Sequence, residues 1–107
     1  MPIPVDKWFW VYILASTPRG VLYIGMTSDL PGRIAEHRAK AQPIFTTRYN
    51  VDRLVYFERH DEAADAARRE RAMKRWRRDW KIELIEQHNP TWRDLFGDLL
   101  RDEGFAW

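Results

Sequence analysis

Five side chains in this sequence are of types that could together perform chemistry: Tyr12, Tyr23, Arg33, His37 and Glu70. Such a set could hydrolyse a phosphodiester. A base activates water, a cation neutralises the charge that develops on the phosphate, and a metal ion held by a carboxylate stabilises the leaving oxygen. Taken singly, His37 would more often be a structural residue and Arg33 a surface cation, so the argument depends on the set.

Glu70 departs most from the pattern around it. On a helix predicted for 61–77 it lies four residues after Ala66 and three before Met73, within or beside the stripe that should face the core. A buried carboxylate is costly unless a cation or a metal ion compensates it. Two interpretations stay open: an ion pair with Lys74, worth about 0.2–0.5 kcal/mol, or a Mg²⁺ ligand whose remaining positions are filled mostly by water.

The pattern of elements predicts an α+β domain with a small antiparallel sheet covered by helices. Strands are predicted for 8–14, 21–25 and 53–58. Helices are predicted from a cap at Ser28 or Asp29, for 61–77 with Asp61 as its cap, for 79–88 and for 91–100. The segment 42–50 is predicted to be a loop. The first six elements follow the order β-β-α-β-α-α along the chain, and the helix predicted for 91–100 comes after them.

The first two strands are predicted to form a hairpin across the turn that contains Pro18 and Gly20. If its centre falls between Thr17 and Pro18, Tyr12 is paired with Tyr23 and both phenols share a face. A slip of one residue would separate them to opposite faces.

Composition sets limits on the class of protein. With 107 residues and 45% hydrophobic side chains, one compact domain is expected. The absence of cysteine excludes disulfides, thiolate metal sites and cysteine nucleophiles. The start "MPIPVDKWFW" does not resemble a targeting segment, and no apolar run approaches membrane-spanning length, so we expect a cytoplasmic protein that does not enter membranes.

A net charge of +2 conceals a strongly basic segment, 68–81, "RRERAMKRWRRDWK", with eight basic and two acidic residues. It is either a solvated helix face or a surface that binds nucleic acid. The candidate phosphate-binding residues are Arg68, Arg69, Arg71, Arg75, Arg77 and Arg78. Trp76, Trp80 and Trp92 could instead form an apolar patch for a protein partner, although their spacing favours core packing.

These residues resemble a known family, the GIY-YIG nuclease superfamily, and within it a small, single-domain bacterial branch. The similarity is carried by "WVY" at 10–12, "YIG" at 23–25, "DLPGRIAEH" at 29–37 and the later Glu70, and it covers about residues 8–95 of a single domain, 1–107. Single tripeptides are weak signals, whereas the ordered set with these spacings is specific.

The resemblance implies a three-stranded antiparallel sheet flanked by helices and hydrolysis with one divalent ion, Mg²⁺ or Mn²⁺. Tyr12 or Tyr23 would act as the general base or orient the water, with nearby cations offsetting the high pKa of a phenol. Arg33 would bind the scissile phosphate, and His37 would hydrogen-bond a tyrosine or the phosphate. Glu70 would be the only protein ligand of the metal ion.

The resemblance also implies supporting residues: Gly25, Tyr49, Lys74 and Asn89. The sequence departs from the family pattern at Trp10, which replaces the first glycine, and at Met26, where some members have a lysine. Lys74 is a speculative substitute for that cation. No separate specificity domain is recognisable, so target recognition is expected from the basic segment, a homodimer or a protein partner.

The function expected from the sequence is a metal-dependent endonuclease on DNA, with RNA left open. It would be structure-selective or weakly sequence-specific and could serve DNA repair or recombination. The alternative is a module of the same fold that binds nucleic acid through 68–81 without cutting it.

Overall fold

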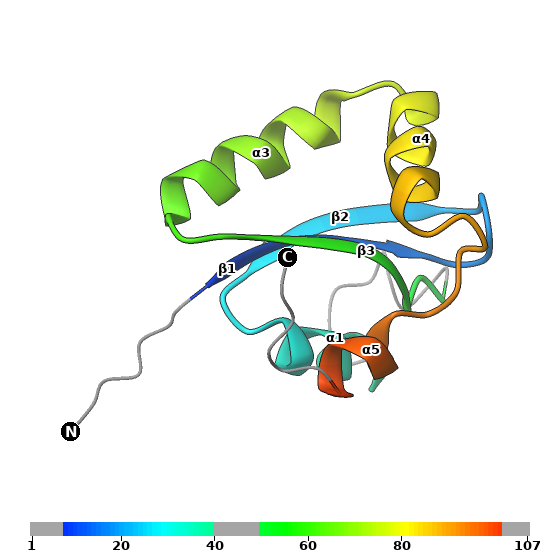
Figure 1. Ribbon diagram of the computed structural model, residues 1–107, viewed down its shortest axis with the longest axis horizontal. Helices are drawn as coiled ribbons and strands as arrows, with labels where there is room; N and C mark the ends of the chain where they lie inside the picture. The colour runs from blue at the N-terminus through cyan, green and yellow to red at the C-terminus, as the bar shows by residue number, and fades with distance from the viewer. Residues whose placement is uncertain (1–7, 40–49, 102–107) are drawn as a thin grey trace.

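The computed structural model describes residues 8–39 and 50–101, which form a three-stranded antiparallel sheet between two layers of helices (Figure 1). The strand order is β2-β1-β3, which confirms the α+β fold expected from the sequence. The elements are β1 (Phe9–Ala15), β2 (Leu22–Thr27), α1 (Leu30–Arg38), β3 (Arg53–His60), α3 (Ala63–Arg75), α4 (Arg78–His88) and α5 (Phe96–Arg101). Among these described residues, no helix is long and apolar enough to cross a membrane.

The central strand β1 is buried on both faces, as its unbroken apolar run predicts. Tyr12 and Leu14 point into a core shared with α1 and α5, whereas Val11 and Ile13 point into a second core under α3 and α4. All four side chains are fully buried. Alternate residues of β1 therefore pack against the two helical layers, which lie above and below the sheet in Figure 1.

The hairpin register differs from the predicted one by two residues. Tyr12 is opposite Gly25, and Tyr23 is opposite Leu14. The turn is centred one residue later than expected, because Arg19 adopts a left-handed backbone (φ 58°) and the Gly20 amide donates to the Thr17 carbonyl at 2.8 Å. A shift of two residues preserves the faces, so both tyrosines still lie on the α1 side of the sheet.

Three predicted helix boundaries are corrected. Asp29 does cap α1, accepting from the Gly32 amide at 3.1 Å, but α3 begins after Glu62 rather than Asp61 and has no side-chain cap. The two helices predicted within the basic segment 68–81 are confirmed, but α3 ends at Arg75 rather than Arg77 and α4 begins at Arg78 rather than Asp79. The chain is extended at Trp76 (ψ 153°) and Arg77 (ψ 152°), so α3 ends and α4 starts in a new direction.

A carboxylate on β3 attaches α3 to the sheet. Glu58 accepts two hydrogen bonds from Arg69 of α3, at 2.9 and 3.0 Å. Its two oxygens are also within 2.6 Å of the Tyr56 hydroxyl and 2.7 Å of Nε2 of His60. The Arg69 guanidinium lies over the Trp76 ring, 5.2 Å from its centroid. These contacts fix the rotation of α3 about its axis.

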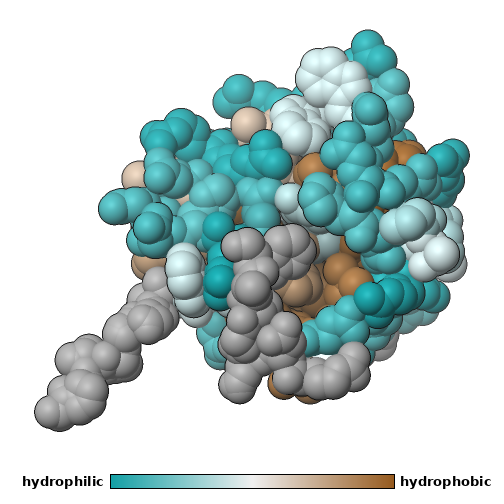
Figure 2. Space-filling view, viewed as in Figure 1, coloured by the Kyte–Doolittle hydropathy of each residue, from teal (hydrophilic) through white to brown (hydrophobic). Residues whose placement is uncertain are grey.

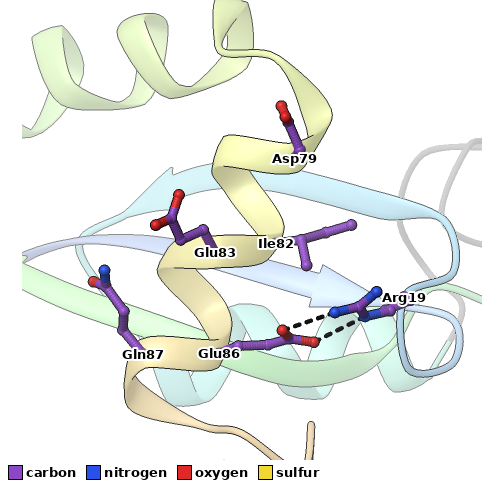
Figure 3. A pocket seen from close by; sticks show the side chains of 6 residues that line it. All are labelled: Arg19, Asp79, Ile82, Glu83, Glu86 and Gln87. Atoms are coloured by element: carbon purple, nitrogen blue, oxygen red, sulfur yellow. Dashed lines mark hydrogen bonds and ion pairs between the residues drawn. The ribbon is translucent and has the colours of Figure 1, made fainter.

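A second ion pair attaches α4 to the hairpin turn. Arg19 donates to both oxygens of Glu86 at 2.9 Å (Figure 3). Nε1 of Trp92 donates to the same carboxylate at 2.7 Å. Arg78 reaches the turn as well, donating to the carbonyls of Arg19 and Gly20. The hollow drawn in Figure 3 is lined by this pair and by further residues of α4, which are Asp79, Ile82, Glu83 and Gln87.

We expect Glu58→Ala to lower the free energy of unfolding by about 1.5–3 kcal/mol, since it removes hydrogen bonds made by a charged group inside the α3–sheet interface. Burial raises the pKa of Glu58, but the hydrogen bonds from Arg69, Tyr56 and His60 lower it more, so the net pKa lies below its ordinary 4.5. The stabilisation should therefore be complete above about pH 4.5 and disappear as the pH falls.

Urea denaturation across this pH range measures the effect. The control is Glu62→Ala, an exposed carboxylate without a side-chain cap bond, for which a change within about 0.5 kcal/mol is expected. Equal stability of Glu58→Ala and the wild-type protein at neutral pH would contradict the assignment.

Candidate active site

The Tyr12 phenol lies directly over Gly25 of the neighbouring strand. A methyl group built at Gly25 would be 2.5 Å from the Tyr12 hydroxyl oxygen, 2.6 Å from its Cζ and 3.0 Å from Cε2 of Tyr23. Gly25 does not have a positive φ, so space rather than backbone freedom requires a glycine here. The missing side chain lets one phenol extend across β2 and the other pack beside it.

Tyr12, Tyr23 and His37 form a cluster of three rings on the α1 face. Ring centroids are separated by 6.2 Å for Tyr12 and Tyr23, 6.2 Å for Tyr12 and His37, and 5.4 Å for Tyr23 and His37. Tyr12 is fully buried and His37 is 3% exposed, whereas Tyr23 is half-buried. Tyr23 is thus the phenol that solvent and a substrate can reach.

The protonation states of Tyr12 and His37 are complementary. Burial and the neighbouring Tyr23 raise the pKa of Tyr12, and Arg33 only partly opposes them. Burial, and then the positive charge of Arg33, lower the pKa of His37. At neutral pH a protonated phenol therefore faces a neutral imidazole. The Tyr12 hydroxyl and Nε2 of His37 lie 3.4 Å apart and form a hydrogen bond whose direction is set by the imidazole tautomer.

Arg33 joins the same cluster from α1, one turn before His37. Its charge and a hydrogen bond act on the Tyr12 phenol, and its Nε pairs with Glu36 at 3.2 Å. That pair is exposed, with 36% of the Arg33 side chain and 50% of the Glu36 side chain accessible. An exposed pair of this kind contributes little stability, so a phosphate can replace Glu36 at low cost.

Glu70 comes from the other side of the sheet. Its helix, α3, packs on the face opposite Tyr12 through Ala66 and Met73, and it contacts the edge strand β2 as well as β1 and β3. The Glu70 side chain is 18% exposed and pairs with Lys74 at 2.7 Å. The ion pair considered as one interpretation of this residue is therefore formed.

The donor set around Glu70 can be compared with what a divalent ion requires. Among residues 8–39 and 50–101, no three His, Asp or Glu side chains converge as metal ligands. A single carboxylate fits Mg²⁺ or Mn²⁺ only if water and substrate oxygens supply the other ligands, which is a coordination that Mg²⁺ readily accepts. Glu70 fits such an ion, provided that Lys74 shares or releases the carboxylate. Its role as a metal ligand stays a prediction.

Most arginines of the basic segment already have partners within the chain. Arg69 is bound to Glu58, Arg68 to Asp65, Arg77 to Asp79 and Arg78 to the hairpin turn. Within the described part of the chain, the exposed Arg71 and Arg75 make no side-chain hydrogen bond or ion pair.

Asn89, one of the predicted supporting residues, lies outside the cluster. Asn89 is 3% exposed, and its amide group donates to the carbonyls of Val55 and Arg93 and accepts from the Arg93 amide. These bonds secure the chain after α4 and give Asn89 a structural role. Tyr49 lies outside the described residues.

Sequence reasoning missed the Glu58 network. Its signal was present, because Tyr56, Glu58 and His60 alternate along one face of a strand. Their partner, Arg69, could not be identified without the packing of α3, since it was one arginine among many in a basic segment.

We expect Gly25→Ala to lower the free energy of unfolding by about 1–3 kcal/mol, because the new methyl group displaces the buried Tyr12 ring. The matched control is Gly97→Ala in α5, where an added methyl group would meet no atom within 4 Å and should be neutral or stabilising by up to about 1 kcal/mol. Urea denaturation compares the two variants. Loss of stability at Gly97 but not at Gly25 would contradict the packing described.

Comparison with known proteins identifies the family of this chain. The family model of the GIY-YIG catalytic domain matches residues 8–83. A UPF0213 protein of Haloquadratum walsbyi is 31% identical over 83 residues, which are 78% of this chain and 92% of that protein. One from Staphylococcus haemolyticus is 33% identical over 78 residues, 73% of this chain and 94% of that protein.

A third UPF0213 protein, from Pediococcus pentosaceus, is 30% identical over 95 residues, 89% of this chain and 99% of that protein. No solved structure gives a significant match. The matched segment contains both tyrosines and extends beyond Glu70. The chain therefore belongs to the GIY-YIG nuclease superfamily.

Proposed function

We propose that this protein is a metal-dependent endonuclease that hydrolyses phosphodiester bonds in DNA, with structural selectivity or weak sequence preference. A role in DNA repair or recombination would fit such an activity. The observation that carries the proposal is the meeting of Tyr12, Tyr23, Arg33 and His37 on one face of the sheet. A purely structural core would not need two phenols, an imidazole and a guanidinium together.

The two phenols and the imidazole of His37 suggest how the attacking water would be activated. Tyr23 is the accessible phenol and orients the attacking water, whereas Tyr12 is too deeply buried to meet it. Neutral His37 is the group that can accept a proton at neutral pH. The water proton passes along the phenols to Nε2 of His37 as the oxygen–phosphorus bond forms and the bond to the leaving oxygen breaks.

Arg33 and Glu70 supply the charges that this step needs. Arg33 exchanges Glu36 for the phosphate and stabilises the negative charge that grows on it. Glu70 would hold Mg²⁺ or Mn²⁺ from the α3 side of β2, and such an ion supplies Lewis-acid stabilisation of the phosphate and the leaving oxygen. The active site then spans the edge of the sheet at β2.

The nuclease should nick flaps, junctions or single strands in the presence of Mg²⁺ or Mn²⁺. We expect Arg33→Ala to lower kcat about 10²–10³-fold, as for other groups that stabilise transition-state charge. Glu70→Ala should abolish both cleavage and Mn²⁺ binding measured by electron paramagnetic resonance. The control on the same helix is Asp65→Ala, a carboxylate paired only with Arg68, which should behave as wild type. Undiminished cleavage by pure Glu70→Ala would refute the metal assignment.

The rate should depend on pH through His37. Because burial and Arg33 lower its pKa from 6.5, kcat/KM should be on its plateau above that pH and fall only at lower pH, as the imidazole becomes protonated. An NMR titration should place the His37 midpoint below 6.5, and Arg33→Ala should move it upward by removing the nearby charge. A midpoint above 6.5 in the wild-type protein would contradict a neutral His37.

A further inference from the structure

Trp80 is an exposed indole at the junction of α3 and α4. It is 50% exposed, and of the described residues only Leu100 among the other large hydrophobic side chains is comparably open. The Trp76 ring meets it edge-to-face at 6.2 Å and 74°. Both rings line a shallow hollow together with Glu83, Leu84 and Gln87. Neither the sheet cores nor the proposed catalytic cluster uses this indole.

One cation lies against the indole of Trp80. The Arg77 guanidinium lies 5.4 Å from the centroid of the Trp80 ring and is itself held by Asp79 at 2.8 Å. A ring fixed in this way loses little freedom when a ligand binds it. Trp80 is thus preorganised as a flat, accessible surface.

Unpaired cations lead to this indole along α3. Arg71 and Arg75 are exposed and are four residues apart, so they lie on the same side of the helix and follow it toward the junction. Figure 2 shows a hydrophilic surface over α3 with paler atoms toward the α3–α4 junction. Such a combination of free guanidinium groups and an exposed aromatic ring favours a polyanion with flat bases over an apolar protein partner.

We propose that Trp80 is a stacking platform for an unpaired base of single-stranded nucleic acid, whose phosphates are bound by Arg71 and Arg75. In a duplex each base is already stacked and paired, so an isolated indole can stack only on a base that has no partner. Glu83 and Gln87, which line the hollow, offer an acceptor and an amide to the base edge.

The platform arginines and the proposed metal ligand belong to the same helix, α3, and in this respect the inference rests on the proposed function and deepens it. Glu70 and Arg71 are neighbours on α3, and Arg75 lies one helical turn nearer the junction. A strand whose scissile phosphate is at Glu70 would therefore continue past both arginines to Trp80. The substrate class is a nucleic acid with a single-stranded segment.

The test is a binding titration without cleavage, using the full chain in a chelator and a fluorescently labelled oligonucleotide, either single-stranded or annealed to its complement. We expect Trp80→Ala to weaken single-strand binding by roughly 5- to 150-fold, the range found for loss of one stacked base. Trp80→Phe should restore most of the affinity, and duplex binding should change much less. Leu100→Ala, which removes an equally exposed apolar side chain on the opposite face, should bind as wild type.

Charge and stacking can be separated by salt. Replacing both Arg71 and Arg75 with Ala should reduce the slope of log affinity against log salt by about 1.4, since each phosphate contact to a single strand contributes about 0.7. Trp80→Ala should leave that slope unchanged.

Three outcomes would overturn the platform: no single-strand binding by the wild-type chain, equal affinity of Trp80→Ala and Leu100→Ala, or a dimer in sedimentation that dissociates when Trp80 is replaced. A dimer that depends on Trp80 would identify the surface around this residue as a protein interface. Because the titration contains no metal ion, Trp80-dependent binding by a chain that never cleaves would refute the nuclease and leave the platform standing. Cleavage by a chain whose single-strand affinity does not change when Trp80 is replaced would refute the platform and leave the nuclease standing.

Discussion

The Tyr12 phenol can cross β2 only because Gly25 has no side chain, and the rest of the site depends on this close approach. With the ring in that place, its hydroxyl meets the His37 imidazole and its edge packs beside Tyr23. Burial then sets the chemistry, since it keeps the phenol protonated and the imidazole neutral. The fully buried Tyr12 is thus held in a fixed position beside His37, and the less buried Tyr23 is the phenol that solvent can reach.

The proposed catalytic groups come from opposite faces of one thin sheet. The α1 face supplies the phenols, His37 and Arg33, whereas the α3 face supplies Glu70. Their relative positions therefore depend on how α3 is attached to the strands. The hydrogen bonds between Glu58 and Arg69 provide that attachment one residue away from Glu70. We therefore expect Glu58, which lies outside the proposed site, to influence the position of the Glu70 carboxylate.

The arginines of the basic segment fall into two groups, paired and exposed, that the sequence does not separate. Arg69 attaches α3 to the sheet and Arg78 attaches α4 to the hairpin turn. Arg68 and Arg77 pair with acidic residues close by in the chain. Arg71 and Arg75 remain exposed on α3, and Trp80 is exposed near the start of α4. The surface proposed to bind a nucleic acid is consequently smaller than eight basic residues suggest.

The sequence alone determined the strands, their order along the chain and the candidate residues, because hydrophobic period, turn residues and motif spacing are local properties. It placed both tyrosines on one face, and this survived an error of two residues in register because strand faces repeat every two residues. Only the tertiary structure decided which phenol is buried, that Asn89 is structural, and which arginines are already paired. Those properties depend on contacts between residues far apart in the chain, and no local pattern encodes them.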